Sequence, residues 1–284
     1  MAAGKLILCA TPIGNLGDMT PRGIDALKEA DLIAAEDTRN SVKLLNHFDI
    51  HTPMTAYHEF NRFEKADDLV RQILDGKTVV CITDAGTPGI SDPGEVLVEK
   101  CIEAGIPVTS LPGANAALNA LVLSGLSTRR FRFEGFLPRE KKEKAEILAE
   151  IREDTATLVF YEAPHRLVKT LNDLLEALGD RKVAVCRELT KVHETVDRTT
   201  LNGAISLFTE QEPKGEFVLV VEGRDPKAKK AEERAKWDGW SIAEHVRHYE
   251  AQGIERKDAL KRVALDRGIP KRDVYQAMLG EEGK

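Results

Sequence analysis

Short apolar runs alternate with helical patterns along the first part of the chain. The runs are bounded by glycine, proline or aspartate, as buried strands usually are, and they cover residues 6–8, 32–35, 54–57, 78–83 and 108–111. One helical repeat lies between the third and fourth runs, at Phe60, Phe63, Ala66, Val70, Ile73 and Leu74. Thr20-Pro21 is typical of a helix start, and Gly76 and Gly105 are typical of helix ends. This alternation predicts a mostly parallel sheet with helices on both faces.

A second series of alternating elements follows and predicts another α/β domain. Its expected strands cover residues 131–136, 157–161, 182–187 and 216–222, and its expected helices cover 141–151, 167–178 and 201–208. We therefore expect a first α/β domain at 1–127 and a second at 128–224.

The remainder of the chain predicts a linker and a small helical module. Residues 225–240 are charged and almost free of apolar side chains, which indicates a solvated linker. In residues 241–284 the apolar spacing predicts three helices, and the offsets of Ala264, Gly268 and Val274 are those of a helix-turn-helix.

Composition and charge narrow the class of protein. The 284 residues are 42% hydrophobic and 31% charged, with a net charge of −6, as in an ordinary globular protein without a uniformly basic coat. The four cysteines are far apart, and no metal-ligand spacing is visible, so we expect buried reduced thiols and no metal. No signal peptide or membrane span is apparent, which favours a cytoplasmic location.

Three loops that leave strands of the first domain share proline and glycine. They are residues 9–18, 83–94 and 111–118. Ligands of open α/β sheets bind beyond the carboxyl ends of the strands, so converging loops of this kind predict a slot for a flat, partly apolar ligand. A plain turn is the alternative for each loop, and Asp92, before Pro93, is expected to act mainly as a helix cap. Neither a G-x-G-x-x-G nor a P-loop sequence is present.

Several separated motifs resemble the tetrapyrrole methylase superfamily, and most closely its branch that methylates ribosomal RNA. They lie in order within residues 5–224: TPIGNLGDMTPR, AAEDTR, DAGTPGISDPG, LPGANAALNAL, FYEAPHR, RELTK and KGEFVLVVEG. The resemblance implies two α/β domains with S-adenosylmethionine in the cleft between them, a homodimer, and 2′-O-methylation of a decoding-centre cytidine in 16S rRNA of the small ribosomal subunit. One departure is Ala114, where the family usually has proline after Pro112-Gly113.

The resemblance also assigns cofactor contacts to residues of this chain. From the first domain it implies Pro12, Gly14, Asp84, Gly86, Thr87, Ile90, Asn115, Ala116 and Ala117. From the second domain it implies Glu162, Leu189, Gly215 and Glu216, for which ordinary packing at strand ends is the alternative. A sulfonium suits backbone carbonyls and a nearby carboxylate, so no phosphate-type anion site is required.

Methyl transfer to a ribose hydroxyl needs positioning and a general base or electrostatic partner. The candidates lie in two polar clusters at strand ends, from which we select Glu36, Glu188 and Lys191, with Glu188 first. Structural ion pairs are the alternative for each.

Basic residues suggest where RNA is bound. Arg39 and Arg166 are candidates near the predicted cleft. In the helical module, eight basic and six acidic residues between Ser241 and Gly280 give +2 in an otherwise acidic chain, and Lys271 and Arg272 are the candidates there. A packing or dimerisation role for the module remains open, as do a tetrapyrrole-like small-molecule substrate and a noncatalytic role in ribosome assembly.

Overall fold

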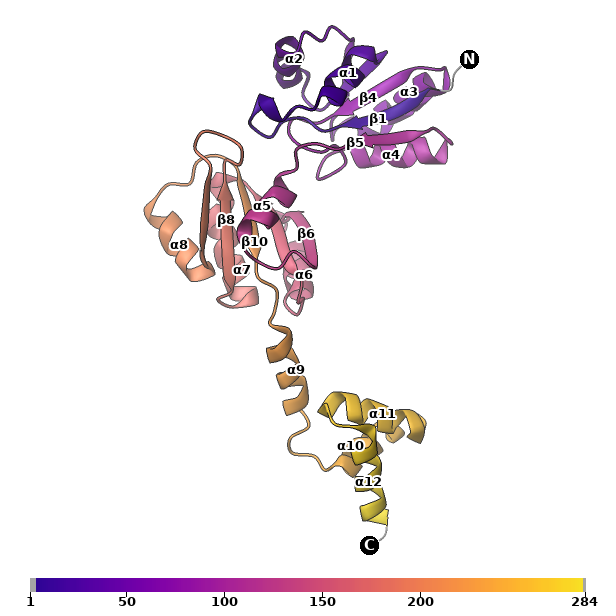
Figure 1. Cartoon of the computed structure of the whole chain (residues 1–284), viewed down its shortest axis with the longest axis vertical. Coiled ribbons are helices and arrows are strands. Elements are labelled where there is room, and N and C mark those ends of the chain that lie inside the picture. Colours follow the sequence, from indigo (N-terminus) through magenta and orange to yellow (C-terminus); the bar gives the residue numbers. More distant parts are fainter. Residues whose placement is uncertain (1–3, 283–284) are drawn as a thin grey trace. The chain divides into compact units, whose positions relative to one another are not determined.

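The computed structural model describes residues 4–282 and divides the chain into two compact units (Figure 1). Unit 1 comprises residues 1–149 and 156–222, and unit 2 comprises residues 150–155 and 223–284. The outermost residues of the predicted first domain and helical module, 1–3 and 283–284, lie outside the described residues. Unit 1 contains both predicted sheets, so each is described below.

The first sheet is parallel throughout, as predicted. Its strands are β1 (Lys5–Cys9), β2 (Leu32–Ala35), β3 (Met54–Ala56), β4 (Thr78–Ile82) and β5 (Val108–Leu111), in the order β3-β2-β4-β1-β5. Because all five strands run the same way, the loops that follow them emerge at one edge.

Helices cover both faces of this sheet. Alternating residues of β1 separate two hydrophobic clusters: Leu6 and Leu8 face one, and Ile7 and Cys9 face the other. Helices α3 (Arg62–Leu74) and α4 (Gly94–Glu103) contribute to the first cluster, and α1 (Pro21–Glu29) and α2 (Thr38–His47) contribute to the second. The predicted helix start is confirmed, since the Thr20 hydroxyl caps α1 by accepting from the Gly23 N–H at 3.1 Å.

The helix predicted between β3 and β4 is confirmed, but the apolar face predicted for it is not buried at its two ends. Helix α3 begins only at Arg62 and buries Ala66, Leu69 and Ile73, whereas Phe60, Phe63 and Leu74 are exposed. Phe60 precedes the helix altogether, so its spacing from the later apolar residues is accidental.

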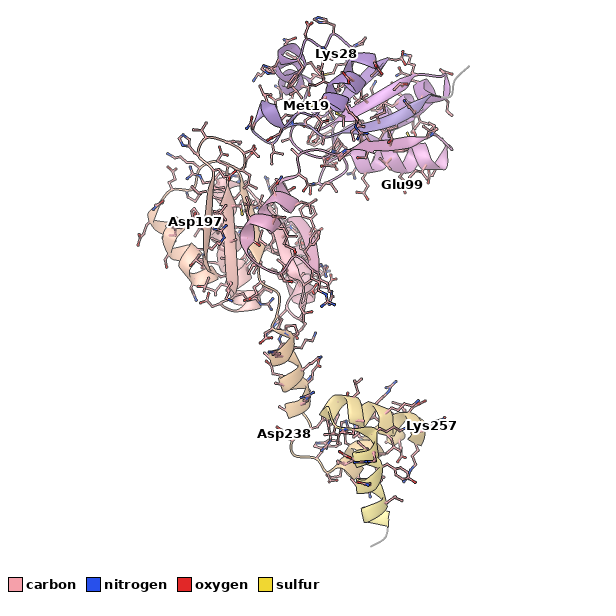
Figure 2. The ribbon with its side chains drawn as sticks, viewed as in Figure 1. Met19, Lys28, Glu99, Asp197, Asp238 and Lys257 are labelled. Carbon is pink, nitrogen blue, oxygen red and sulfur yellow. The ribbon has the colours of Figure 1, made fainter. Side chains whose placement is uncertain are left out.

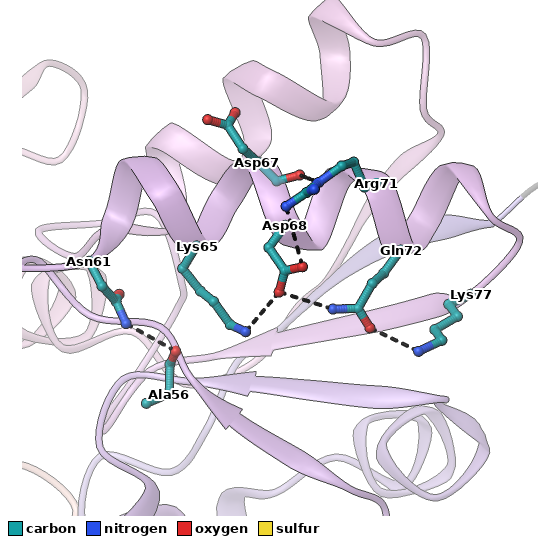
Figure 3. A network of polar contacts seen from close by, with 8 residues as sticks. All are labelled: Ala56, Asn61, Lys65, Asp67, Asp68, Arg71, Gln72 and Lys77. Atoms are coloured by element: carbon teal, nitrogen blue, oxygen red, sulfur yellow. Dashed lines mark hydrogen bonds and ion pairs between the residues drawn. The ribbon is translucent and has the colours of Figure 1, made fainter.

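Polar contacts line one flank of α3 (Figure 3). The Asp68 carboxylate accepts from the Lys65 ammonium at 2.9 Å and from the Gln72 amide at 3.2 Å, and the Gln72 carbonyl accepts from Lys77 at 2.9 Å. The first two contacts, at i+3 and i+4, stabilise the helix, and the third joins it to the residue that precedes β4.

The second sheet is mixed. Its strands are β6 (Phe131–Phe136), β7 (Thr157–Glu162), β8 (Lys182–Arg187), β9 (Thr195–Thr200) and β10 (Phe217–Val221), in the order β6-β7-β10-β8-β9. Only β6 and β7 are parallel; the other neighbours are antiparallel. Helices α6 (Lys141–Ile151), α7 (Leu167–Leu178) and α8 (Leu201–Glu210) lie at or next to their predicted positions, whereas β9, a polar edge strand, is not predicted from sequence.

Helix α5 (Ala116–Ser124) connects the two sheets by its packing. It lies inside the range expected for the first domain, yet its buried residues Ala117, Ala120 and Leu121 pack with Val159, Val220 and other residues of the second sheet. The Asn115 side chain caps its start, and Gly125, with φ of 76°, ends it. Helix α5 and Ile13, from the loop after β1, therefore belong to the hydrophobic cluster of the second sheet.

Unit 2 is helical. It comprises α9 (Pro226–Ala235), α10 (Ile242–Ala251), α11 (Arg256–Arg267) and α12 (Lys271–Glu282), and a small core is formed by the last three. Gly268, with φ of 62°, forms the left-handed turn between α11 and α12, where the helix-turn-helix spacing placed it. The predicted charged linker is largely the helix α9, which buries none of its residues. Lys257, near the start of α11, is exposed (Figure 2).

The thiols behave as predicted. All four cysteines are free and buried, and burial raises the pKa of Cys9 to about 11 and that of Cys186 to about 12. Within residues 4–282, none of the helices has the length and apolar character that crossing a membrane requires.

Candidate functional site

A cavity of about 430 Å³ opens within unit 1, between loops of the first sheet and strand ends of the second. Four loops at the carboxyl edge of the first sheet contribute to its lining, after β1, β2, β4 and β5, through Ile13, Glu36, the segment 83–92 and Asn115. The predicted convergence of the three proline- and glycine-containing loops is therefore confirmed. A cavity of this volume suits a small-molecule ligand or cofactor.

Hydrogen bonds join the three loops to one another. Thr11 and Gly86 exchange two backbone hydrogen bonds, at 2.9 and 3.0 Å. The Thr87 hydroxyl donates to the Ala114 carbonyl at 3.1 Å and accepts from the Asn115 amide at 3.3 Å. Gly86 has φ of 89°, a conformation that favours glycine, and a Cβ atom there would lie 3.4 Å from Ile13. The loop conformations are thus fixed by one another.

Three acidic residues line the cavity at the carboxyl edge of the first sheet, namely Glu36, Asp84 and Asp92. Glu36 accepts from the Thr83 hydroxyl and from the Asp84 N–H, the latter at 3.2 Å. Asp84 accepts from the Asp37 N–H at 3.2 Å and from the Asn40 amide at 3.1 Å. Partial burial raises the pKa of Asp84 above its ordinary value; the Asn40 amide opposes this shift and the neighbouring Glu36 adds to it.

Asp92, expected to act mainly as a helix cap, precedes Pro93, which occupies the N-cap position of α4, and it also lines the cavity. Its carboxylate accepts from the N–H groups of Gly89 at 2.8 Å, Ile90 at 3.2 Å and Gly94 at 2.8 Å, the last being the first residue of α4. The carboxylate therefore stabilises the loop that carries Thr87 and Ile90.

Glu188, Lys191 and Glu216 form a rim cluster beside the cavity. The Lys191 ammonium lies 2.9 Å from Glu188 Oε1 and 2.9 Å from Glu216 Oε2, and Glu188 Oε1 also accepts from the Glu216 N–H at 2.9 Å. Burial by itself would raise the pKa of Glu188, but the Lys191 ammonium and the Glu216 N–H outweigh it and lower the pKa. Glu188 is thus a stably ionised partner of Lys191.

The rim cluster fixes two glycines and a strained turn. A Cβ atom at Gly14 would lie 2.4 Å from the Lys191 side chain, and one at Gly215 would lie 2.6 Å from the Glu188 carboxyl group. Glu188 and Thr190 have positive φ angles, 51° and 67°, which non-glycine residues adopt at a cost of roughly 1–3 kcal/mol each. Such strain is concentrated at functional sites, and here it lies on both sides of Leu189, which lines the cavity.

Most residues predicted for the cofactor line this cavity. They are Asp84, Gly86, Thr87, Ile90, Asn115, Ala116, Glu162, Leu189 and Glu216. The other four lie just behind it: Pro12 is half-buried next to Ile13, Ala117 faces the second sheet, and Gly14 and Gly215 support the rim cluster. Of the residues predicted for catalysis, Glu36 lines the cavity, whereas Glu188 and Lys191 stand at its rim.

The Glu162 carboxylate is directed to internal partners. It accepts from the Ala163 N–H at 2.8 Å and from the Thr170 hydroxyl, and it lies 3.5 Å from the Arg166 guanidinium. Arg166 also donates to the Leu137 carbonyl at 2.6 Å. Arg166, predicted for RNA, is therefore largely engaged inside unit 1.

The other basic residues predicted for RNA are exposed. The Arg39 side chain is 88% exposed and pairs with Asp37 at 2.7 Å, at the start of α2. Lys271 and Arg272 begin α12 of unit 2 and are exposed.

Sequence reasoning missed the apolar wall that the second sheet contributes. That wall comprises Phe136, Tyr161, Phe217 and Val218, and Ile13 completes it from the first loop. Tyr161 stands directly before Glu162, and Phe217 and Val218 directly follow Glu216, so the quoted motifs offered a signal for three of them. The others look like ordinary core residues, because the apolar patterns of a cavity wall and of a core are the same.

Comparisons with known proteins agree with this architecture. The sequence profile described as tetrapyrrole (corrin/porphyrin) methylases matches residues 5–204. The chain is 52% identical over 272 residues to "Ribosomal RNA small subunit methyltransferase I" of Halalkalibacterium halodurans, covering 96% of this chain and 93% of that protein. It is 47% identical to the protein of the same name from Bacillus subtilis, covering 96% and 94%. The chain belongs to this family of tetrapyrrole methylases. As a member, it is an S-adenosylmethionine-dependent methyltransferase.

Solved structures show the same fold. Diphthine synthase superimposes with a TM-score of 0.63 at 16% identity, covering 78% of this chain and 90% of that one. Uroporphyrin-III C-methyltransferase from Thermus thermophilus, in complex with S-adenosylhomocysteine, superimposes with a TM-score of 0.53 at 18% identity, covering 77% and 97%. At these identities the comparison concerns the fold alone.

Proposed function

We propose that the protein transfers the methyl group of S-adenosylmethionine to the ribose 2′-oxygen of a decoding-centre cytidine in 16S rRNA. The observation that carries the proposal is the extent of the similarity to the ribosomal RNA enzymes. Those relatives are 43–52% identical to this chain, and several of them match at least 96% of it. The relative from Thermotoga maritima matches 78% of this chain over its own full length, so the similarity to these enzymes does not depend on unit 2. Only the resemblance of the motifs to the branch that methylates ribosomal RNA supports the ribose 2′-oxygen as the methylated atom.

The residues around the cavity fit S-adenosylmethionine. Ile13, Ile90 and Leu189 offer apolar walls, and the Asp84 carboxylate supplies negative charge suited to a sulfonium. When bound, the cofactor supplies an electrophilic methyl group to an incoming oxygen. The small residue Ala116 and Gly86, which lacks a side chain, allow close approach of backbone to the ligand.

Glu36 is the better placed of the two predicted bases. Its carboxylate lines the cavity and is oriented by the Thr83 hydroxyl and the Asp84 N–H, so it can accept a hydrogen bond or a proton from an acceptor hydroxyl. Glu188 is held by Lys191 and Glu216 and has a lowered pKa, which makes it a weak base. We therefore assign the base to Glu36 and a positioning role to Glu188 and Lys191.

A homodimer in the cytoplasm completes the proposal. Helix α5 buries one face against the second sheet and leaves Leu118 and Val122 exposed on the other, at i and i+4. A second copy of the chain is the partner that the motifs imply, and this apolar face is suited to it.

The test is transfer of labelled methyl from S-adenosylmethionine to small ribosomal subunits that lack the modification, with nuclease mapping of the labelled nucleotide. We expect label on the 2′-oxygen of the decoding-centre cytidine. Free 16S rRNA serves as the second substrate and distinguishes recognition of an assembled subunit from recognition of RNA alone. Absence of label on RNA, together with measured cofactor binding, would contradict the proposal and direct the search to small-molecule acceptors.

A further inference from the structure

The turn between β3 and α3 exposes two phenylalanine rings. In this segment, residues 57–63, here called the aromatic turn, Phe60 is 98% exposed and Phe63 is 59% exposed. Single exposed apolar residues are common, but an almost bare aromatic ring has no packing role in unit 1. The cofactor cavity and the base assigned above make no use of it.

The aromatic turn is held in one conformation. The His58 N–H donates to the Asn61 side chain at 2.8 Å, the Asn61 N–H donates to the His58 carbonyl at 3.0 Å, and the Asn61 amide donates to the Ala56 carbonyl at 3.2 Å (Figure 3). The His58 and Phe60 rings are arranged edge to face, with their centroids 6.2 Å apart. Phe60 is therefore displayed on a fixed support, so little conformational freedom of the backbone is lost on binding.

The aromatic turn lies next to the candidate active site. The Tyr57 N–H donates to the Ala35 carbonyl at 2.8 Å, and the Tyr57 hydroxyl donates to the Pro93 carbonyl at 2.7 Å. The neighbours of these two acceptors in sequence, Glu36 and Asp92, both line the cavity. The turn thus emerges at the carboxyl edge of the first sheet, beside the assigned base.

The chemistry around the two rings is that of a nucleobase site. The Arg62 guanidinium stacks over the Phe63 ring, 4.8 Å from its centroid, and also pairs with Glu59. Charged side chains therefore accompany the two rings in the turn, whereas the core of a protein-binding surface is depleted of charged residues. Unpaired bases of RNA stack on exposed aromatic rings and on guanidinium planes, with polar groups beside them.

We propose that the aromatic turn binds the RNA substrate, with Phe60 stacking on an unpaired base next to the nucleotide whose ribose enters the active site. This inference rests on the proposed function, because it takes RNA to be the substrate. It adds a substrate-binding residue to a region in which sequence analysis saw only a core position. Continuity with the cavity through Tyr57 selects RNA over other occupants.

The test compares four proteins by the kcat/KM for methylation of unmodified small subunits: wild type, Phe60→Ala, Phe60→Leu and Phe60→Trp. We expect losses of about tenfold or more for alanine and leucine, which lack a ring, and activity within about threefold of wild type for tryptophan. Affinity for S-adenosylmethionine, measured by calorimetry, stays unchanged in all four. Leu74→Ala is the matched control, since Leu74 is a 61% exposed apolar residue at the other end of α3.

Three results would overturn the inference while leaving the proposed function intact. The first is a wild-type kcat/KM in Phe60→Ala. The second is full activity in Phe60→Leu, which would indicate simple apolar contact. The third is a Phe60→Ala protein that is monomeric while the wild type is dimeric, which would assign the turn to contact with a second copy. Should wild type methylate no RNA, the proposed function fails on its own. In that case RNA binding by the turn is measured by photo-cross-linking from p-benzoylphenylalanine at position 60 to the RNA of the small subunit. A cross-link supports the inference, and its absence contradicts the inference.

Discussion

The two glutamates predicted as bases differ at the level of single side chains. The Glu36 carboxylate accepts hydrogen bonds from neutral donors only, the Thr83 hydroxyl and the Asp84 N–H. The Glu188 carboxylate accepts from the Lys191 ammonium and from a backbone N–H. A carboxylate whose charge is already satisfied accepts a proton poorly, because its pKa is lowered. Sequence analysis placed Glu188 first, and the hydrogen bonds of the two residues now favour Glu36.

Exchanging each glutamate for glutamine tests this difference. We expect Glu36→Gln to lower kcat by about 100-fold or more with little change in affinity for S-adenosylmethionine, since general-base contributions are of this order. Glu188→Gln weakens the hold on Lys191 and so raises KM for the cofactor, with kcat within about tenfold of wild type. Steady-state kinetics with unmodified subunits provide the measurement, and the reverse pattern would return the base to Glu188.

At the scale of elements, helix α5 joins the cofactor loops to the second sheet. Asn115 caps this helix by accepting from the Leu118 N–H at 3.0 Å, and its amide donates to Thr87 in the neighbouring loop. One side chain therefore fixes both the start of α5 and a wall of the cavity.

Asn115→Ala is expected to reduce stability and cofactor binding together. Loss of the cap destabilises unit 1 by about 1 kcal/mol, and release of Thr87 raises the dissociation constant for S-adenosylmethionine. Thr200→Ala is the control, because the Thr200 hydroxyl caps α8 by accepting from the Gly203 N–H and lies outside the cavity lining. Denaturant unfolding and calorimetry distinguish the two variants; equal cofactor affinity in both would show that the cap has no part in the site.

The elements that sequence predicts well are those that are buried along one face or on all sides, because their apolar residues then form a regular pattern or a continuous run. Strands β1 and β4 are apolar runs between breakers, and their positions follow from this alone. Strand β9 escapes prediction because it is a polar edge strand, and Phe60 misleads because periodicity cannot distinguish an exposed aromatic from a buried one. The site loops were predictable from their proline and glycine content, whereas the wall from the second sheet was not, because it depends on tertiary packing.

For the whole molecule, unit 2 is the part that distinguishes this chain from a bare methylase fold. Lys271 and Arg272 begin α12 with exposed side chains, next to the left-handed turn at Gly268. Basic residues placed there suit contact with phosphates of the ribosomal subunit, the role proposed for this unit.

Neutralising both residues tests that role. We expect Lys271→Ala/Arg272→Ala to weaken binding of unmodified subunits and to reduce the slope of log affinity against log salt by about 2, one for each lost phosphate contact. Lys141→Ala/Lys142→Ala, on the exposed start of α6, is the matched pair. Binding at several salt concentrations gives the slopes, and equal slopes for the two double variants would assign unit 2 to packing or dimerisation.

The placement of α5 has a consequence for building hybrids between related methylases. A crossover at residue 127 would transplant α5 together with the first sheet and force its buried residues onto a foreign second sheet. A crossover before Asn115 keeps α5 with the strands it packs against, but it separates the Asn115 cap from Thr87 unless that loop is inherited from the same parent. Recombination between members of this family is therefore constrained at two places, the buried face of α5 on the second sheet and the contact of Asn115 with Thr87.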